Sequence, residues 1–301
     1  MARLAGQIPL HALAIGFVAV ACLIPAIFDG LRVLEDRATT LKESARDTAN
    51  LARAVGQHAD DALRMVDGVL SGFVERLEAE ATTPEAVLRQ RQFLMTRATM
   101  LPSVVLLAFI DSNGDVVMGS LAALPKINLA DREYFSYHRD HNSREVHLSP
   151  PVIDRVKNKW IIPLTRRVNH PDGSFAGVML AAMDVAYFER FYQNFDIGQN
   201  GAILLASLDG TLLVRRPFDE SKIGVNLRDG EVFGALRHGG LIGNVEGSSL
   251  TDGTDRLNSY RVLASYPLVV AVARSKDEVL APWRARAWSD VVGDLGMAVL
   301  I

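Results

Sequence analysis

Cysteine is almost absent from this sequence, which has a single one, Cys22, in 301 residues. One thiol cannot form an intramolecular disulfide, and it cannot supply the several thiolates of a cysteine-based zinc site. Cys22 also lies inside a long apolar run near the start of the chain. The folded part of the chain therefore has no disulfide framework, no cysteine-based zinc site and no cysteine nucleophile.

The sequence also lacks a charge excess and the short motifs of enzymes. Lys and Arg number 32 against 35 Asp and Glu, so electrostatics give no reason to expect nucleic acid as a partner. No G-x-S-x-G, H-E-x-x-H or glycine-rich phosphate loop occurs, although these patterns place a nucleophile, a metal or an anion by backbone geometry. We expect no enzyme within this chain and no cofactor.

Charged side chains are missing from residues 8–28, IPLHALAIGFVAVACLIPAIF. About 20 apolar residues in a helix cross a hydrocarbon core of about 30 Å, so this run is predicted to be a transmembrane helix. A cleaved signal peptide is the alternative, but the run is long and no A-x-A site follows it. Arg3, in a cytoplasmic segment 1–7, favours an orientation that leaves the globular part outside the cytoplasm, anchored to the inner membrane.

A second membrane segment is predicted to begin within residues 281–301. Trp283 and Trp288 stand among arginines, as is typical of a membrane interface, and the apolar stretch 291–301 is interrupted only by Asp294. This stretch is too short to span, so the chain is expected to continue through the membrane. The alternative is an amphipathic helix that packs on the globular part.

Residues 29–82 are predicted to form one long stalk helix. Small or apolar residues recur there at intervals of three and four, with charged residues on the other faces. They are Leu31, Leu34, Ala38, Leu41, Ala45, Thr48, Ala52, Val55, Ala59, Ala62, Val66, Val69 and Phe73. An alanine-rich seam suits close helix approach, either in a parallel homodimer or against the domain's own sheet, and the pattern does not decide between them.

Strand patterns follow, and their layout occurs twice. In residues 83–195 a helix leads to a hairpin over 103–118, a helix over 131–140, and extended segments at 146–153, 159–168 and 175–184. In residues 196–280 a hairpin over 201–215 is followed by a helix over 231–237 and strands at 256–264 and 268–274, with Gly239-Gly240 and 247–249 interpreted as turns. We predict two consecutive α+β units with antiparallel sheets.

Three segments, taken together and in this order, carry a family resemblance. They are DREYFSYHRDH (131–141), LSPPVIDRVKNKWIIPLTRRVNHPDGSFAGVMLAAMDVAYFERFY (148–192) and GQNGAILLASLDGTLLVRRP (198–217). They resemble the double-Cache (PDC-type) sensor domains of bacterial transmembrane receptors. The resemblance implies a membrane-distal PAS-like module that holds a small ligand and a membrane-proximal PAS-like module. It also implies a cytoplasmic output beyond the chain, commonly a diguanylate cyclase, otherwise a histidine kinase or a chemotaxis signalling domain.

Several residues of the distal unit suit a pocket for a carboxylate or an amino acid. In the amino-acid-binding relatives an Arg, an aromatic pair and a strand-end Asp bind the ligand, and here Arg132, Tyr134 and Asp184 match, although Glu133-Tyr134-Phe135 replaces x-W-Y. Alternation in the strand near 160–166 adds an aromatic and a guanidinium on one face. The predicted ligand-binding residues are Arg132, Tyr134, Tyr137, His138, Trp160, Arg166 and Asp184. The alternative is that the aromatic residues are core and that Asp131 and Arg132 form a helix-capping ion pair.

Three histidines of the same unit, His138, His141 and His147, form only part of a ligand set, so no metal site is predicted. If the distal unit holds no ligand, the chain is a structural module that dimerises the receptor through its stalk.

Overall fold

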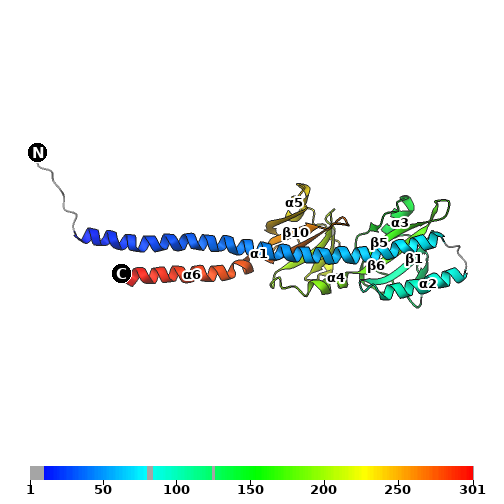
Figure 1. Cartoon of the computed structure of the whole chain (residues 1–301), viewed down its shortest axis with the longest axis horizontal. Coiled ribbons are helices and arrows are strands. Elements are labelled where there is room, and N and C mark those ends of the chain that lie inside the picture. The colour runs from blue at the N-terminus through cyan, green and yellow to red at the C-terminus, as the bar shows by residue number, and fades with distance from the viewer. Residues whose placement is uncertain (1–9, 80–83, 124–125, 301) are drawn as a thin grey trace.

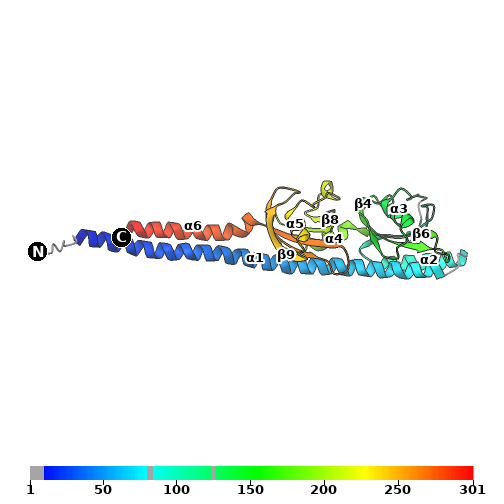
Figure 2. The same ribbon diagram turned by 90° about the horizontal axis from the view of Figure 1, so that it is seen from above.

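The computed structural model describes residues 10–79, 84–123 and 126–300. Its longest element is α1 (Leu10–Ala79), a helix of 70 residues, which at 1.5 Å per residue is about 105 Å long. Figures 1 and 2 show a rod in which two globular modules sit in a row along the C-terminal half of α1. The helix α6 (Lys276–Leu300) runs beside the N-terminal half of α1 in both views. The N-terminal half of α1 and the helix α6, which we call the two arms, therefore leave the modules at the same end.

The module farther from these arms is the distal module. It begins with α2 (Pro84–Thr99) and contains a six-stranded antiparallel sheet of order β2–β1–β6–β5–β3, with β4 paired to β5. Its strands are β1 (Val104–Asp111), β2 (Val116–Gly119), β3 (His147–Leu148), β4 (Val152–Ile153), β5 (Trp160–Asn169) and β6 (Phe175–Asp184). Helix α3 (Glu133–Asp140) lies between β2 and β3, and α4 (Val185–Tyr192) follows β6 directly.

The proximal module repeats this arrangement with a five-stranded antiparallel sheet of order β8–β7–β11–β10–β9. Its strands are β7 (Ala202–Ser207), β8 (Leu212–Arg216), β9 (Ile242–Ser248), β10 (Asp255–Val262) and β11 (Leu268–Ser275), with a 3₁₀ turn η1 (Glu220–Lys222) and helix α5 (Glu231–Arg237). In both sheets an edge hairpin is joined to the last strand of the module. The predicted α+β fold with a long helix and two antiparallel sheets is confirmed.

One apolar core joins both sheets to α1. It includes residues of α1 such as Ala59, together with Ile162 and Met179 of the distal sheet and Ile203 and Val270 of the proximal sheet. Small side chains on α1 allow the helix to lie close to both sheets, which is why the seam is rich in alanine. Of the two arrangements left open for this seam, packing against the chain's own sheets is therefore the one observed between residues 52 and 74.

Polar contacts fix the position of α1 along the modules. The Thr48 hydroxyl lies 2.6 Å from that of Ser259 in the proximal sheet, and both groups are buried. Toward the distal end, the Asp67 carboxylate accepts two hydrogen bonds from Arg166 of β5, at 2.6 and 3.0 Å. Because each contact joins α1 to a different sheet, a sliding movement of the helix would break both.

Two local expectations need correction or addition. Gly247 and Ser248 were expected in a turn but lie in β9, whose residues alternate between exposed and half-buried positions. This edge strand has few apolar residues, so its sequence lacks the usual strand signal. The helix α4 was not predicted, because its first turn continues the apolar pattern of β6.

The membrane segments stay predictions. No helix within the described ranges has the length and mean hydropathy expected of a membrane span. The segment 1–7 that is predicted to be cytoplasmic, the first two residues of the predicted span 8–28, residues 80–82 of the predicted stalk and Ile301 lie outside the described residues. In the arm that is described, Leu31 and Leu34 are 61% and 65% exposed, so the first part of the seam is not covered by either module. Dimerisation through the stalk also stays a prediction.

Candidate ligand-binding site

The two faces of the distal sheet are covered differently. Strand alternation turns Ile162 and Met179 toward α1, and turns Leu106, Ile161 and Leu180 to the opposite face. A cavity of about 10 Å³ lies on this opposite face, and its lining comprises Leu106, Ile127, Leu129, Arg132, Tyr134, Val152, Ile153, Asp154, Arg155, Val156, Ile161 and Leu180. That volume holds about one water molecule. The protein's own side chains thus fill most of the space between the sheet and its cover.

Polar groups converge where this cavity opens. Arg132 lies just before α3, and its guanidinium donates to the backbone carbonyl of Ile153 at 3.0 Å. Asp154 is buried, and its Oδ2 accepts from the backbone amides of residues 156 and 157 at 3.1 and 2.6 Å. Burial raises the pKa of Tyr134 to about 12, so its hydroxyl is a neutral donor at physiological pH. A cation, an anion and a neutral donor therefore line one small site.

A wider groove of about 540 Å³ leads away from the cavity along the surface. It shares three charged residues and both residues of β4 with the cavity. Its lining comprises Arg132, Pro151, Val152, Ile153, Asp154, Arg155, Asn158 and Trp160. The Arg155 guanidinium pairs with Asp131 at 2.6 and 2.9 Å, and its hydrogen bonds lower the pKa of that carboxyl. At the other end, the Trp160 indole donates to Glu220 of the proximal module at 2.8 Å. The groove thus extends from the cavity mouth toward the neighbouring module.

A cluster of aromatic and titratable groups lies beside the cavity, between α3 and β3. His138 is fully buried, its Nε2 is 3.0 Å from the Thr165 hydroxyl, and burial lowers its pKa to about 4. The Tyr137 ring stacks on His147 with 3.7 Å between centroids, and His147 lies 3.0 Å from Glu133, whose pKa it lowers by hydrogen bonding. Within the described residues, no group of three or more His, Cys, Asp or Glu side chains is arranged to hold a metal ion. None of these five residues lines the cavity.

Arg166 faces away from this site. Ile162 and Leu164 share its face of β5 and belong to the core packed on α1, and its guanidinium binds Asp67 of that helix. The expectation that Arg166 lies in the pocket wall is thus corrected by the register of β5. Its neighbour Arg167 occupies the opposite face, where it donates to the carbonyl of His138. This contact ties the last turn of α3 to the sheet.

Asp184 ends β6 as expected, but it caps a helix. Its Oδ1 accepts from the backbone amide of Ala186 at 3.0 Å, which is the usual role of an N-cap aspartate. Its other oxygen lies 3.7 Å from the Lys159 ammonium and 3.9 Å from the Arg190 guanidinium. Asp184 is not among the residues that line the cavity or the groove.

The structure thus brings Arg132 and Tyr134 together at the cavity and adds Trp160 at the groove. Tyr137 and His138 lie beside them, whereas Arg166 and Asp184 lie elsewhere, and ligand binding by all seven stays a prediction. Sequence reasoning missed Asp154 and Arg155. Their signal was present in V-I-D-R-V-K-N-K-W, where an Asp after a short strand caps a tight turn that ends at Asn158, a residue with a φ of 53°.

Comparison with known proteins places this geometry in a family. Residues 36–283 match the Cache domain family dCache_1. The extracellular domain of the putative histidine kinase rpHK1S-Z16 is 31% identical, with a TM-score of 0.72 over 81% of this chain and 99% of that one. A search of curated protein sequences gave no match.

Two ligand-binding domains of lower identity share the fold. The domain of the Pseudomonas fluorescens chemoreceptor CtaA, solved with L-isoleucine, is 17% identical, with a TM-score of 0.60 over 82% of this chain and 98% of that one. The domain of Mlp24, solved with asparagine, is 15% identical, with a TM-score of 0.59 over 84% and 99%. The family match spans both sheets and most of α1, as the sequence resemblance predicted. The chain belongs to the Cache domain family, as a double-Cache sensor domain of the dCache_1 type.

Proposed function

We propose that this chain is the sensing part of a transmembrane receptor, and that its distal module binds a small amino acid or carboxylate. One observation carries the proposal. Arg132, Tyr134 and Asp154 meet on one face of the distal sheet, and the opposite face of the same sheet packs on α1. A ligand that moves the sheet or its cover would therefore act on the helix that leads back to the membrane arm.

The charges at the cavity mouth select the class of ligand. A planar guanidinium such as that of Arg132 suits a carboxylate, and the buried Asp154 suits an ammonium group. The groove of about 540 Å³ has room for this polar part, whereas the cavity of about 10 Å³ must open to take a side chain. A small α-amino acid has the carboxylate, the ammonium group and the small side chain that these three features require. The relatives solved with L-isoleucine and asparagine support this class.

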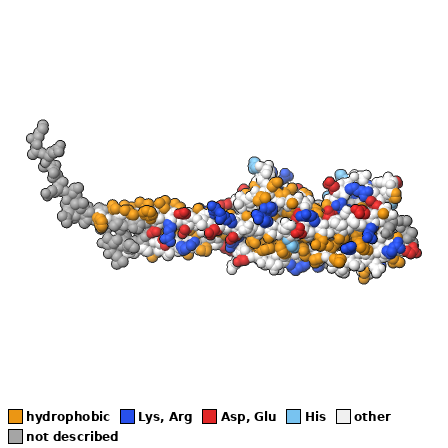
Figure 3. Space-filling view, viewed as in Figure 1, with side chains coloured by type: hydrophobic (Ala, Val, Ile, Leu, Met, Phe, Trp, Pro, Cys, Tyr) orange, Lys and Arg blue, Asp and Glu red, His pale blue; other side chains and the backbone are white. Residues whose placement is uncertain are grey.

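The two arms support a membrane anchor. Large apolar side chains are exposed along the N-terminal part of α1, where Figure 3 shows them gathered on one side of the arm. They include Phe17, Val20, Leu23, Ile24, Ile27 and Phe28, each more than half exposed. Such a patch is costly in water and favourable in a bilayer. With α6 beside α1, we propose an inner-membrane receptor whose modules lie outside the cytoplasm.

We propose a histidine kinase as the output. The sequence resemblance favoured a diguanylate cyclase, but the 31% identity to the extracellular domain of rpHK1S-Z16 supports a kinase more directly. The chain itself is proposed to be non-catalytic, acting on its output through α1 and α6.

Thermal unfolding of the purified chain in detergent tests the proposed ligand class. We expect at least one small amino acid or short carboxylate to raise the midpoint temperature, because a ligand that binds only the folded state stabilises it. Arg132→Ala and Asp154→Asn should each weaken this binding at least tenfold. Asparagine keeps the oxygen that caps the 156–157 turn, so the second variant removes charge with little change in the turn.

Arg139→Ala is the matched control, because the Arg139 side chain is exposed and, among the described residues, pairs only with its neighbour Asp140. It should bind as wild type does. The proposal fails if a complete amino-acid panel and short carboxylates give no stabilisation, or if both site variants bind with unchanged affinity.

A further inference from the structure

The proximal module also has a cavity on the sheet face turned away from α1. Its volume is about 70 Å³, against about 10 Å³ in the distal module. Small residues leave this space open, because the sheet contributes Ala202 from β7, Ala273 from β11 and Gly247 from β9, and the cover contributes Gly230. The full lining comprises Ala202, Leu204, Arg215, Leu227, Gly230, Glu231, Val232, Phe233, Gly247, Ser248, Ser249, Leu250, Thr251, Arg256, Asn258 and Ala273.

Two arginines at one end of this cavity are buried, at 5% exposure for Arg215 and 4% for Arg256. Both bind a single carboxylate, that of Asp252, at 2.5 Å from Arg215 and at 2.7 and 3.0 Å from Arg256. Each also donates to a backbone carbonyl, of Pro217 and Asn200 respectively. Two buried cations thus share one hydrogen-bonded carboxylate, and the carboxylate of Asp219 acts on Arg215 through charge without a hydrogen bond among the described residues. An anion in the cavity would add a second direct partner for the two guanidinium groups, since buried charges are stable when they are paired and hydrogen-bonded.

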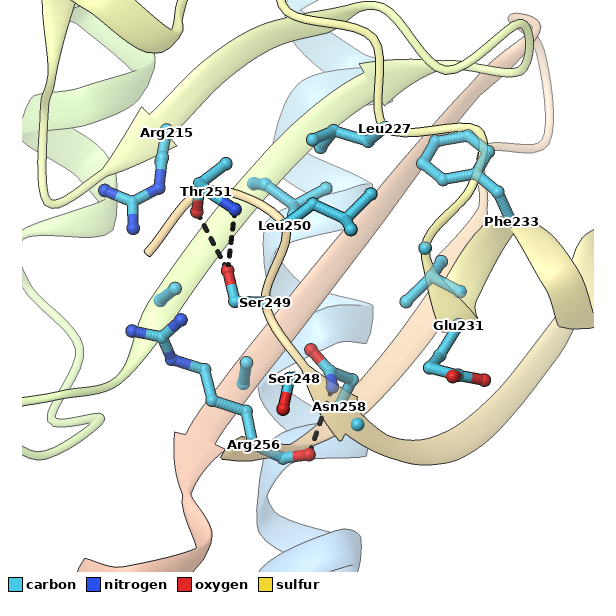
Figure 4. Close-up of a pocket in the computed structure, with 16 residues that line it drawn as sticks. Arg215, Leu227, Glu231, Phe233, Ser248, Ser249, Leu250, Thr251, Arg256 and Asn258 are labelled. Carbon is cyan, nitrogen blue, oxygen red and sulfur yellow. Dashed lines mark hydrogen bonds between the residues drawn. The ribbon is translucent and has the colours of Figure 1, made fainter. Parts of the chain in front are cut away.

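The rest of the lining separates by polarity. In Figure 4 the guanidinium groups of Arg215 and Arg256 lie on one side, near the hydroxyls of Ser249 and Thr251, and Leu227 and Phe233 lie on the other.

A further carboxylate in the lining, that of Glu231, lies on the apolar side in Figure 4, away from the arginines, and it is exposed to solvent. It does not compete for the buried guanidinium groups. The cavity therefore has a cationic end, a narrow alanine floor and an apolar end, which together suit an anion with a short hydrocarbon tail.

We propose that the proximal module binds a short-chain monocarboxylate in this cavity. One buried water needs about 15 Å³, so a cavity of about 70 Å³ has room for about five water-sized groups. This space suits a ligand with a chain of about four carbon atoms. The carboxylate would face Arg215 and Arg256, and the tail would lie over Ala202 and Ala273 toward Phe233. This site is separate from the proposed distal site and does not depend on it.

Calorimetric titration of the purified chain with sodium n-butyrate tests the proposal. We expect binding with a Kd below about 1 mM. Butylammonium chloride and n-butanol, which share the tail but lack the anion, should bind at least tenfold more weakly. Ala273→Leu fills the cavity from the sheet and should weaken butyrate binding at least tenfold, and Ala202→Val fills it from the adjacent strand if the first variant does not fold.

Arg139→Ala is the control and should bind butyrate as wild type does, and Arg132→Ala, which removes the carboxylate partner of the distal site, tells the two sites apart because a probe in the proximal cavity keeps its affinity. The proposal is overturned if butyrate does not bind, if folded cavity-filling variants bind it as wild type does, or if the charge of the probe makes no difference. Loss of butyrate binding in Arg132→Ala would also overturn it, because the probe would then occupy the distal site. The first three outcomes leave the proposed distal function untouched.

Discussion

His138 shows how a single side chain couples the fold of the distal module to pH. Its imidazole is fully buried, one ring nitrogen faces the Thr165 hydroxyl, and the other has no hydrogen-bond partner in the part of the chain that the structure describes. Protonation would place a charge in this buried site, beside His147 and Arg167, with the hydrogen bond to Thr165 and the charge of Glu133 favouring it. Burial, with electrostatic repulsion by His147 and Arg167, lowers the pKa of His138 to about 4, from 6.5 in an exposed histidine.

The depressed pKa of His138 predicts a loss of stability in mild acid. Between pH 6.5 and about 4 the unfolded chain binds the proton and the folded chain does not, so the stability present at pH 7 falls as the pH falls through this range. The full effect is about 3 kcal/mol. Urea unfolding gives the free energy of unfolding at pH 7.5 and at pH 4.5. The decrease in this free energy between the two pH values should be smaller by about 2 kcal/mol in His138→Gln than in wild type.

The exposed His238 provides the control, since His238→Gln should keep the wild-type dependence on pH. An equal drop in wild type and His138→Gln would show that other groups cause the acid sensitivity.

At the same scale, two adjacent arginines show why sequence alone could not complete the site. Residues along β5 are buried on both faces, so alternation predicts which residues share a face but not which face meets the stalk. Arg166 was assigned to the pocket, yet it binds Asp67 of α1, while Arg167 lies under α3. A shift of one residue exchanges the two faces of a strand. Arg132 and Tyr134, which a local motif marked, both line the cavity.

At the scale of the element, the small residues of α1 decide how closely both sheets approach it. Ala59 is fully buried in the core that the helix shares with the sheets. Such a position has no space for a larger side chain, because protein interiors are packed as densely as organic crystals. The three-and-four spacing predicted this seam correctly, but an alanine seam suits a second helix equally well, so the sequence could not name the partner.

Ala59→Leu is expected to destabilise the chain by about 1–3 kcal/mol, because the added atoms must push α1 and the sheets apart. Urea unfolding followed by circular dichroism measures the change. Met65→Leu is a matched control on the same helix, since Met65 is 56% exposed and receives the same new side chain. Equal stability of the two variants would show that the seam is loosely packed.

Elements with a weak sequence signal were the ones missed. The edge strand β9 contains Gly243, Gly247 and only two large apolar residues, so it resembles a loop until β10 pairs with it. The helix α4 begins directly after β6, and its start depends on the cap provided by Asp184. In both cases tertiary pairing or capping determines the structure, whereas the strong periodicity of α1, β1 and β11 is sufficient to predict them.

At the scale of the whole molecule, the two modules share one core through α1. Leu107 of β1, Val66 of α1 and Leu205 of β7 belong to the same buried cluster. Arg216 of β8 also donates to the carbonyl of Tyr192 in α4 at 2.6 Å, a second connection between the modules. A domain built in this way transmits a change in one sheet to the other, because neither can move without disturbing the shared core.

This shared core predicts that the modules unfold together. Hydrogen exchange should give opening free energies within about 1 kcal/mol of each other for the amides of β6 and β11, which are interior strands of the distal and proximal sheets. The edge strand β9 is the internal control and should exchange faster through local opening. Ala59→Leu should lower the values for β6 and β11 by the same amount, since it acts on the helix that both sheets use. If β6 instead opened more than about 2 kcal/mol below β11, or if the substitution changed only one of them, the modules would be separate folding units. The distal site would then have to signal by displacing a whole module along α1, and the Asp67–Arg166 pair would have to break during that movement.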